Sequence, residues 1–268
     1  MKIFVCVKQV PDTRGKVSLK KDGSLDRAKM PTIINPDDLG AVEAALKLKD
    51  QTGARVIALT MGPPMAEIML HELYAMGVDE TVLITARELV GSDTYGTSTV
   101  LAAVIDEIGL EKDDIIFCGR QAIDGDTAQV GPELAEKLGI AQLTYVASVE
   151  REEHALICRR LLEDGCMTVR VPTPCLLGCV KEVDVPRTMR ISRIFGWDRT
   201  RDMRVITYGQ IQNFPLFDES VMGTEKAPTI VLTSFPLAKK SGGLLLEGES
   251  GEMAGKLFDE LEARQVLG

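Results

Sequence analysis

Hydrophobic residues in the first half of the chain occur in short unbroken runs, and stretches with helical spacing separate these runs. The runs at 2–9, 55–60, 81–85 and 115–117 are typical of strands that are buried on both faces. Helices are expected from Asn35-Pro36 to about Gly53, after Met61–Pro64 as far as Met76, and from the Gly91–Ser98 stretch to about Gly109. In the first of these, Asn35 is expected to be the N-cap and Pro36 the first helical residue. Strands that alternate with helices predict an α/β fold with a parallel sheet covered on both faces.

After Ala141 the pattern changes. The stretches 143–150, 154–161, 166–171 and 175–180 alternate or run apolar without helices between them, which predicts antiparallel strands. A turn is expected at 10–13, after the first strand, and a hairpin at 16–26, centred on Asp22-Gly23. Residues 209–251 have weak periodicity, and an amphipathic helix is expected at 252–266. We therefore expect one domain over residues 1–206 and an arm over 207–268, which packs on another protein because it has no core of its own.

The stretch from Asp113 to Gly139 joins a buried strand to a helix through a polar loop. Helical spacing begins at Thr127, Asp126 or Thr127 is expected to cap the helix, and Gly119 and Gly125 are expected to allow tight turns. The loop presents Arg120, Gln121, Asp124, Asp126, Thr127 and Gln129, which are more hydrogen-bonding groups than capping requires. Free amides at the helix start predict a phosphate site, although most such turns in α/β proteins bind nothing.

A second polar loop, Gly91–Ser98, also opens a helix. Its carboxylate and hydroxyls include Asp93, Thr94 and Thr97, and a ligand site and a solvated helix start explain them equally well. Ligands of parallel sheets lie outside the carboxyl ends of strands. Five stretches can therefore face one crevice: Cys6 with Gln9–Asp12, Asn35–Asp38, Met61–Pro63, the Thr94 loop, and Asp124–Gly131. Five bordering loops suit an extended dinucleotide better than a lone phosphate ester.

Composition excludes several functions. Among 268 residues, 40 acidic and 31 basic side chains give a net charge of −9, which argues against nucleic acid or an anionic membrane as the main partner. The apolar start is interrupted at Lys8, so it resembles neither a signal peptide nor a membrane span, and a cytoplasmic location is expected. Six cysteines without C-x-x-C spacing and two histidines predict buried, reduced thiols and no metal site.

The stretch 185–206 is rich in arginine and interleaves these basic residues with apolar ones. Ile191, Ile194, Phe195 and Trp197 lie among six arginines. This mixture predicts a surface for a protein partner, and a solvated basic loop is the common alternative.

Four motifs resemble the beta subunit of electron-transfer flavoproteins. They are V-K-Q-V-P-D at 7–12, N-P at 35–36, M-G-P at 61–63 and G-R-Q-A-I-D-G-D-T-A-Q-V-G-P at 119–132. The resemblance spans essentially the whole chain. It implies a Rossmann-like fold of the adenine-nucleotide-hydrolase type, a larger alpha subunit as partner, and electron exchange with dehydrogenases through FAD.

Members of this family fill the nucleotide site in two ways. Respiratory members hold AMP as a structural ligand, whereas others bind a second FAD, take hydride from NADH and split the electron pair between two acceptors. D-T-x-x-T-S at 93–98 and G-D-T-A-Q at 125–129 resemble the second group. This likeness implies FAD here, an acyl-CoA dehydrogenase-type flavoenzyme as partner, and ferredoxin or flavodoxin as the low-potential acceptor. A non-bifurcating subunit with AMP is the alternative.

The resemblance and the two polar loops together define the expected site. Cys6, Asn35, Asp38, Met61 and the run Asp124–Gly131 match family positions that line the nucleotide, and Val10-Pro11-Asp12 would lie near the flavin ring. The full set of expected cofactor-binding residues is Cys6, Val10, Pro11, Asp12, Asn35, Asp38, Met61, Gly62, Asp93, Thr94, Thr97, Arg120, Asp124, Gly125, Asp126, Thr127, Ala128, Gln129, Val130 and Gly131. The expected partner-binding residues are Ile191, Ile194, Phe195 and Trp197. No catalytic side chain is expected, because hydride transfer to a flavin needs no protein nucleophile.

Two regions depart from the family pattern. Met167 and Gly178 stand where other residue types are usual, and Phe195–Arg199 replaces the lysine-rich stretch that normally follows an apolar anchor, here Ile191. The departures leave the identity of the dehydrogenase open. An ATP-binding domain of the stress-protein type shares this kind of sheet, but the long arm argues against it.

Overall fold

The computed structural model describes residues 1–12, 31–230 and 242–266, so the hairpin expected at 16–26 lies outside the described residues. The main sheet has the strand order β11-β5-β4-β1-β6-β10-β7-β8-β9 in the described part of the chain. Its strands are β1 (Lys2–Cys6), β4 (Arg55–Met61), β5 (Glu80–Ile84), β6 (Ile115–Gly119), β7 (Ala141–Arg151), β8 (Ala155–Leu162), β9 (Gly165–Pro172), β10 (Cys175–Cys179) and β11 (Met203–Ile206). All neighbours from β11 to β7 are parallel, and β7, β8 and β9 are antiparallel. The alternation of strands and helices thus gives the predicted parallel sheet.

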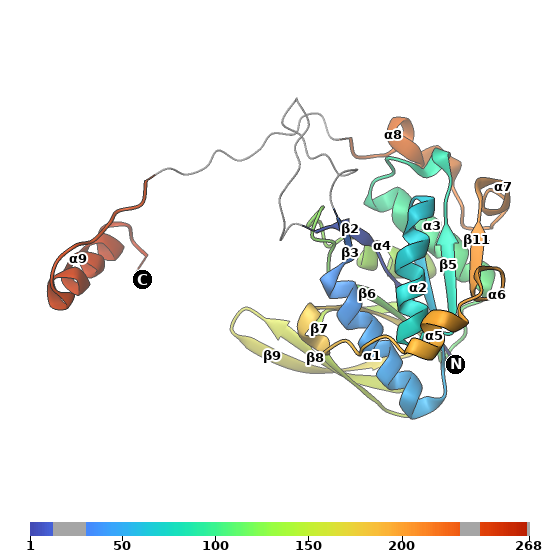
Figure 1. Ribbon diagram of the computed structural model, residues 1–268, viewed down its shortest axis with the longest axis horizontal. Coiled ribbons are helices and arrows are strands. Elements are labelled where there is room, and N and C mark those ends of the chain that lie inside the picture. The colour runs from blue at the N-terminus through green and yellow to red at the C-terminus, as the bar shows by residue number, and fades with distance from the viewer. Residues whose placement is uncertain (13–30, 231–241, 267–268) are drawn as a thin grey trace.

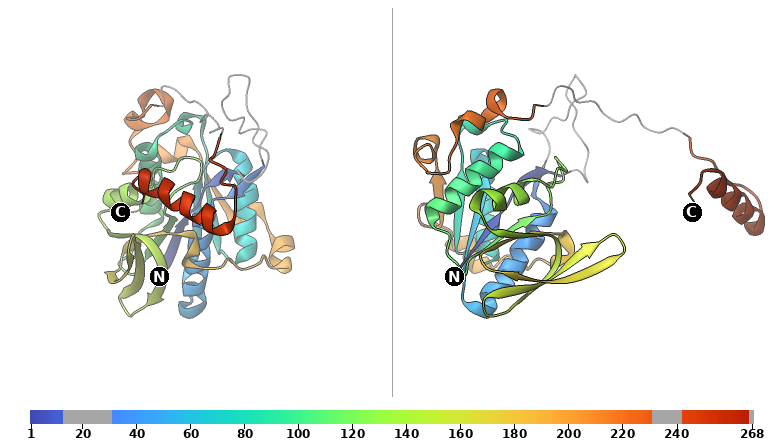
Figure 2. Two further views of the ribbon diagram at one scale, coloured as in Figure 1. Left: turned by 90° about the vertical axis from the view of Figure 1, so that its left-hand side faces the viewer. Right: turned by 180° about the vertical axis from the view of Figure 1, so that it is seen from behind.

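Helices cover both faces of this sheet (Figures 1 and 2). One face carries α1 (Pro36–Thr52), α2 (Glu67–Met76) and α5 (Ile191–Gly196), and the other carries α3 (Thr94–Ile108) and α4 (Val130–Leu138). Successive side chains of a strand point to opposite faces, so Ile3 and Val5 join the first apolar cluster while Phe4 and Cys6 join the second. Burial on both sides explains why the central strands are unbroken apolar runs.

The start and end of α1 are determined by residues within the helix or next to it. Pro36 occupies the first turn, where its missing N–H is not needed, and Gly53 closes the helix in the left-handed region with φ 70°. The Gly53 N–H donates to the Lys49 carbonyl at 2.8 Å. The predicted helix is therefore confirmed at both ends.

The prediction that 175–180 forms an antiparallel strand is wrong. β10 lies between β6 and β7 and is parallel to both, while β7, β8 and β9 form the predicted antiparallel meander. All five residues of β10 are buried. An apolar run of this length fits any interior strand, and the tertiary arrangement decides its direction.

The arginine-rich stretch is not a continuous loop. It contains α5, α6 (Arg199–Asp202) and β11, which pairs with β5 at the edge of the sheet. Two short helices follow, α7 (Tyr208–Ile211) and α8 (Gly223–Lys226), and Ile211 and Met222 are buried in the cluster beneath α3. The domain boundary at 206/207 stays a prediction.

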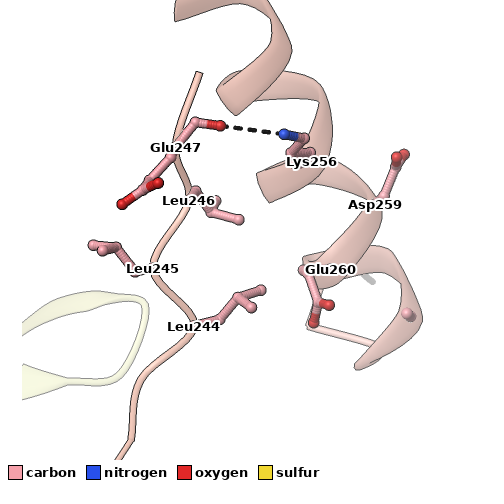
Figure 3. A pocket seen from close by; sticks show the side chains of 8 residues that line it. Leu244, Leu245, Leu246, Glu247, Lys256, Asp259 and Glu260 are labelled. Carbon is pink, nitrogen blue, oxygen red and sulfur yellow. Dashed lines mark hydrogen bonds between the residues drawn. The ribbon is translucent and has the colours of Figure 1, made fainter. Parts of the chain in front are cut away.

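The last helix, α9 (Ser250–Ala263), has no buried residue and lies well apart from the sheet in Figure 1. It begins and ends slightly earlier than the expected range 252–266. An extended segment, Leu244–Glu247, runs beside it and lines a shallow hollow with it (Figure 3). Lys256 Nζ donates to the Glu247 carbonyl at 3.2 Å across this hollow. None of the described helices is long and apolar enough to cross a membrane.

Candidate functional site

The carboxyl ends of β1 and β6 are joined by the first turn of α1. The two strands are in register at Cys6 and Cys118. Asp38 accepts hydrogen bonds from the backbone N–H of Lys8 at 2.8 Å and of Gly119 at 2.9 Å. One buried carboxylate therefore fixes both strand exits, and through them the two segments that follow.

Asn35 holds the next part of the polar loop. Its Nδ2 donates to the Gln121 carbonyl at 2.8 Å, and its Oδ1 accepts from the Ile123 N–H at 3.2 Å. Asn35 is fully buried and is the N-cap residue of α1, as predicted, but its side chain makes no capping hydrogen bond to the helix. The bonds to the loop replace the cap, because the amide can satisfy a donor and an acceptor there.

The two loop glycines differ in what the structure requires of them. Gly119 is needed for close approach, since a Cβ there would lie 2.2 Å from Asp38 Oδ1. Gly125 lies in a tight turn, as predicted, and its N–H donates to the Ala122 carbonyl at 3.2 Å, but it has neither a positive φ nor a neighbour within 4 Å of a Cβ. The left-handed positions are instead Asp126, with φ 51°, and Ala128, with φ 54°. The chain thus turns at two non-glycine residues on either side of Thr127.

The start of α4 exposes a row of backbone donors. The helix begins at Val130 with Gln129 as its N-cap, so the prediction that Asp126 or Thr127 caps it is wrong. The N–H groups of Thr127, Ala128 and Gln129 have no hydrogen-bond acceptor among the described residues. The first amides of a helix lack partners as well, and alternating backbone conformations can bring such donors together around an anion. This arrangement fits a phosphate or pyrophosphate.

A glycine lets this helix end approach the sheet. A Cβ on Gly131 would lie 2.8 Å from Cys118 Sγ. The donors at the start of α4 are therefore close to the end of β6, where Gly119 ends the strand and Arg120 follows.

Both basic side chains near the loop are already paired. Lys8 Nζ lies 2.7 Å from Asp124 Oδ1, and Arg120 Nε lies 3.4 Å from Asp37 Oδ2. Burial raises the pKa of Asp37, and the charge of Arg120 opposes this shift. With the cations compensated, backbone N–H groups supply much of the positive potential that remains for an anion.

Two other ionisable groups beneath the loop are shielded from solvent. Burial raises the pKa of Asp38 to about 7, although the bonds from the Lys8 and Gly119 amides favour its charged form. Burial and the nearby Asp38 raise the pKa of Cys6 to about 12. Cys6 is therefore a packing residue under the site and a poor nucleophile.

Comparison with known proteins gives this geometry its context. Residues 22–200 match the electron transfer flavoprotein domain family. Over the full length of both chains, the protein is 49% identical to acryloyl-CoA reductase electron transfer subunit gamma of Anaerotignum propionicum. It is 45% identical to electron transfer flavoprotein subunit beta of Clostridium acetobutylicum and 42% identical to caffeyl-CoA reductase-Etf complex subunit CarD of Acetobacterium woodii, each over the full length of both chains. The chain belongs to the beta-subunit branch of the electron transfer flavoprotein family.

The second polar loop of this flavoprotein chain is tied to the first. Asp93 caps α3 by accepting from the Gly96 N–H at 2.9 Å, and its other oxygen accepts from the Thr229 N–H at 2.9 Å. The Thr94 hydroxyl donates to Glu133 of α4 at 3.1 Å. These contacts place the starts of α3 and α4 side by side, so both helix starts border the same edge of the sheet.

The remaining expected site residues are less closely connected. Val10 and Pro11 belong to β2 (Gln9–Pro11), which pairs with β3 (Thr32–Ile34), so the prediction of a turn at 10–13 is wrong for these two residues. Met61 ends β4, and the Gly62 N–H donates to the Ile84 carbonyl at 3.0 Å. Met61 packs against the second apolar cluster, and no hydrogen bond among the described residues joins its side chain to the loop after β6.

The expected partner surface of the flavoprotein divides into anchored and exposed residues. Trp197 packs between His71 and Tyr74, with ring centroids 5.2 and 5.0 Å away. Ile194 is half-buried, whereas Ile191 and Phe195 are 72% and 86% exposed.

The arginines around this surface act within the chain. Arg187 binds Glu43 through both carboxylate oxygens and also pairs with Asp50. Arg193 donates to the Tyr74 and Val78 carbonyls. Arg193 therefore holds α5 and Arg187 holds the segment before it, while Arg190 is exposed beside the apolar side chains of Ile191 and Phe195.

Two residues at the site were missed by sequence reasoning. Lys8 lies inside the V-K-Q-V-P-D motif, and its pairing with Asp124 could have been inferred from the motif's position at a strand end. Tyr145 lies in β7 and contacts Arg120, and no local signal indicates this. Five of the six cysteines are buried as expected, and Cys166 is exposed.

Proposed function

We propose that this chain is the beta subunit of an electron-bifurcating electron transfer flavoprotein and binds FAD at the start of α4, beside the ends of β1 and β6. When bound, FAD accepts hydride from NADH and passes electrons onward. The observation that carries the proposal is the row of backbone N–H groups at 127–129, which continues into the first turn of α4. A pyrophosphate needs several such donors, and these backbone groups supply them at a helix start.

The other residues of the site act on the protein itself. Asn35 and Asp38 fix the backbone from which the donors project. The strand β2 contains Val10 and Pro11 and is followed by Asp12, and in our proposal this segment lies against the flavin ring. Hydrogen bonds and charges around a flavin set its reactivity, which is the task we assign to these groups. A non-bifurcating subunit with AMP at the same site is the second candidate, because the same donors suit a single phosphate.

The proposed partners are an alpha subunit, an acyl-CoA dehydrogenase-type flavoenzyme, and ferredoxin or flavodoxin, all in the cytoplasm. The relatives support a multi-subunit assembly, since their names describe subunits of acryloyl-CoA and caffeyl-CoA reductase complexes. The exposed helix α9 supports an arm that packs on the alpha subunit, because none of its residues is buried within this chain. The apolar pair Ile191 and Phe195 supports a docking surface for the flavoenzyme.

The nucleotide content of the complex tests this proposal. The chain is coexpressed with its alpha subunit, the purified complex is denatured, and released FAD and AMP are quantified. NADH is then added anaerobically to the intact complex while flavin absorbance is recorded. Two FAD per heterodimer and bleaching by NADH are expected. One FAD with one AMP and no response to NADH would refute the bifurcating assignment and favour the second candidate.

A matched pair of variants tests the position of the site. Ala128 has φ 54°, which glycine adopts freely and a β-branched residue does not. We therefore expect Ala128→Gly to keep the nucleotide and Ala128→Val to lose it, with circular dichroism spectra unchanged in both. Full nucleotide content in Ala128→Val would place the site elsewhere.

A further inference from the structure

Strand β7 is irregular at one residue beside the proposed site. Gly178 of β10 pairs with Thr144 and the next residue, Cys179, pairs with Val146, so Tyr145 is skipped. Tyr145 has φ 58°, a left-handed conformation that bulky residues rarely adopt, and its side chain is partly exposed. Bulges of this kind redirect a side chain out of the regular strand pattern, and backbone strain is found where the surroundings enforce it.

The redirected ring lies against Arg120. The guanidinium carbon is 5.6 Å from the centroid of the Tyr145 ring. The Arg120 N–H donates to the Cys179 carbonyl at 2.7 Å, so the arginine leaves the sheet at the level of the bulge. Within the described part of the chain, Asp37 is the one ion-pair partner of Arg120, and Arg120 Nε makes no hydrogen bond there. The guanidinium is thus held by a ring and a nearby carboxylate, with hydrogen-bonding capacity left over.

We propose that Tyr145 is a positioning residue that aims Arg120 at the phosphate of the bound nucleotide. This inference rests on the proposed function, since it adds a residue to the same site. An arginine side chain loses considerable rotational freedom when it is fixed on a ligand, and a ring face that holds it beforehand removes part of that cost. Arg120 follows β6 directly, and Gly131 brings the free donors of α4 to the end of the same strand. The ring therefore favours ligands that carry a phosphate over the corresponding nucleosides.

Titration of AMP and adenosine tests the inference, because the two ligands differ only in the phosphate. Both are titrated by calorimetry into the complex with the alpha subunit after removal of nucleotide, for the wild type and four variants. The variants are Tyr145→Asn, Tyr145→Phe, Arg120→Gln and the double variant Tyr145→Asn with Arg120→Gln. Asparagine tolerates the left-handed backbone, so Tyr145→Asn removes the ring without a new conformational demand.

We expect Tyr145→Asn to weaken AMP binding about three- to tenfold, as for loss of one partly exposed cation–π contact, and to leave adenosine binding unchanged. Tyr145→Phe keeps the ring and should bind as the wild type. The double variant should bind AMP no more weakly than Arg120→Gln alone, because the ring acts through the arginine. The melting temperature of Tyr145→Asn should not fall below that of the wild type.

Unchanged AMP binding in Tyr145→Asn would overturn the inference and leave the proposed function standing. Equal losses for AMP and adenosine would also overturn it, since the ring would then act independently of the phosphate. A wild-type complex that binds neither AMP nor FAD would refute the proposed site itself, and the role of Tyr145 with it.

Discussion

Replacing Asp38 by asparagine should remove a pH dependence from the stability of the chain. Asp38 is buried and bridges the Lys8 and Gly119 N–H groups. Its pKa in the folded chain is raised from 3.8 to about 7. Because the folded pKa is the higher one, protonated Asp38 contributes stability that is complete below pH 3.8 and is lost as pH rises through about 7.

The size of the effect follows from the two pKa values. Each unit of difference corresponds to about 1.4 kcal/mol, so a shift from 3.8 to about 7 amounts to roughly 4 kcal/mol over the whole range. Between about pH 5 and about pH 8 the loss is roughly 2 to 3 kcal/mol. Asparagine does not titrate, and it leaves one of the two backbone donors unsatisfied at a cost of about 1 to 3 kcal/mol that does not vary with pH.

Urea unfolding at several pH values measures this difference. The free energy of unfolding of the wild type minus that of Asp38→Asn should fall by roughly 2 to 3 kcal/mol from about pH 5 to about pH 8. Subtracting the free energy of the variant removes the contributions of the other titrating groups, because both proteins share them. Asp106→Asn, at an exposed position of α3, serves as the control for a change of charge alone. A difference that stays constant with pH would refute the burial argument for Asp38.

Three further predictions concern packing and docking. Gly131→Ala should destabilise the chain by about 1 to 3 kcal/mol in urea unfolding and reduce bound nucleotide, because its Cβ would collide with Cys118 of β6. Gly125→Ala is the matched control and should change neither quantity, because its Cβ would meet no neighbour. Glu43→Gln should lower the free energy of unfolding by about 2 to 4 kcal/mol and speed proteolysis of the 184–190 segment, because Arg187 loses its buried charged partner. Unchanged cleavage would show that the pair does not anchor this segment. Phe195→Ala should leave the melting temperature unchanged and weaken binding to the partner flavoenzyme in surface plasmon resonance. Trp197→Ala should instead lower the melting temperature, because its ring packs on Tyr74. A lower melting temperature with unchanged binding in Phe195→Ala would exclude an exposed docking role for this residue.

The parts of the fold that sequence reasoning predicts are those with local causes. The ends of α1 depend on Asn35-Pro36 and Gly53, which lie within the helix or next to it. The central strands are recognisable because burial on both faces leaves unbroken apolar runs. β10 satisfies the same description, but its direction depends on β6 and β7, which pair with it across long stretches of chain. No short window contains that information.

The candidate site, too, is predictable from the sequence only where its causes are local. The polar loop is visible in the sequence, but its conformation is not, since the left-handed positions fall at Asp126 and Ala128 and leave the glycines out. The sequence indicates that Asn35 is the N-cap of α1, but it does not show that the side-chain amide binds the loop after β6 instead of the helix. The pairing of Arg187 with Glu43 joins residues 144 positions apart, so sequence reasoning placed this arginine on an open surface.

The position of β10 has a consequence for how the chain is made. β7 pairs with the rest of the parallel sheet through β10 alone among the described strands, and β10 is reached only after the β8–β9 hairpin. A ribosome that has released β1 to β6 has therefore produced a sheet whose β6 edge is open, and the chain must reach Cys179 before that edge is closed. Late pairing of this kind exposes an apolar strand edge during synthesis. The nascent chain is thus most vulnerable to aggregation while residues 120 to 179 emerge.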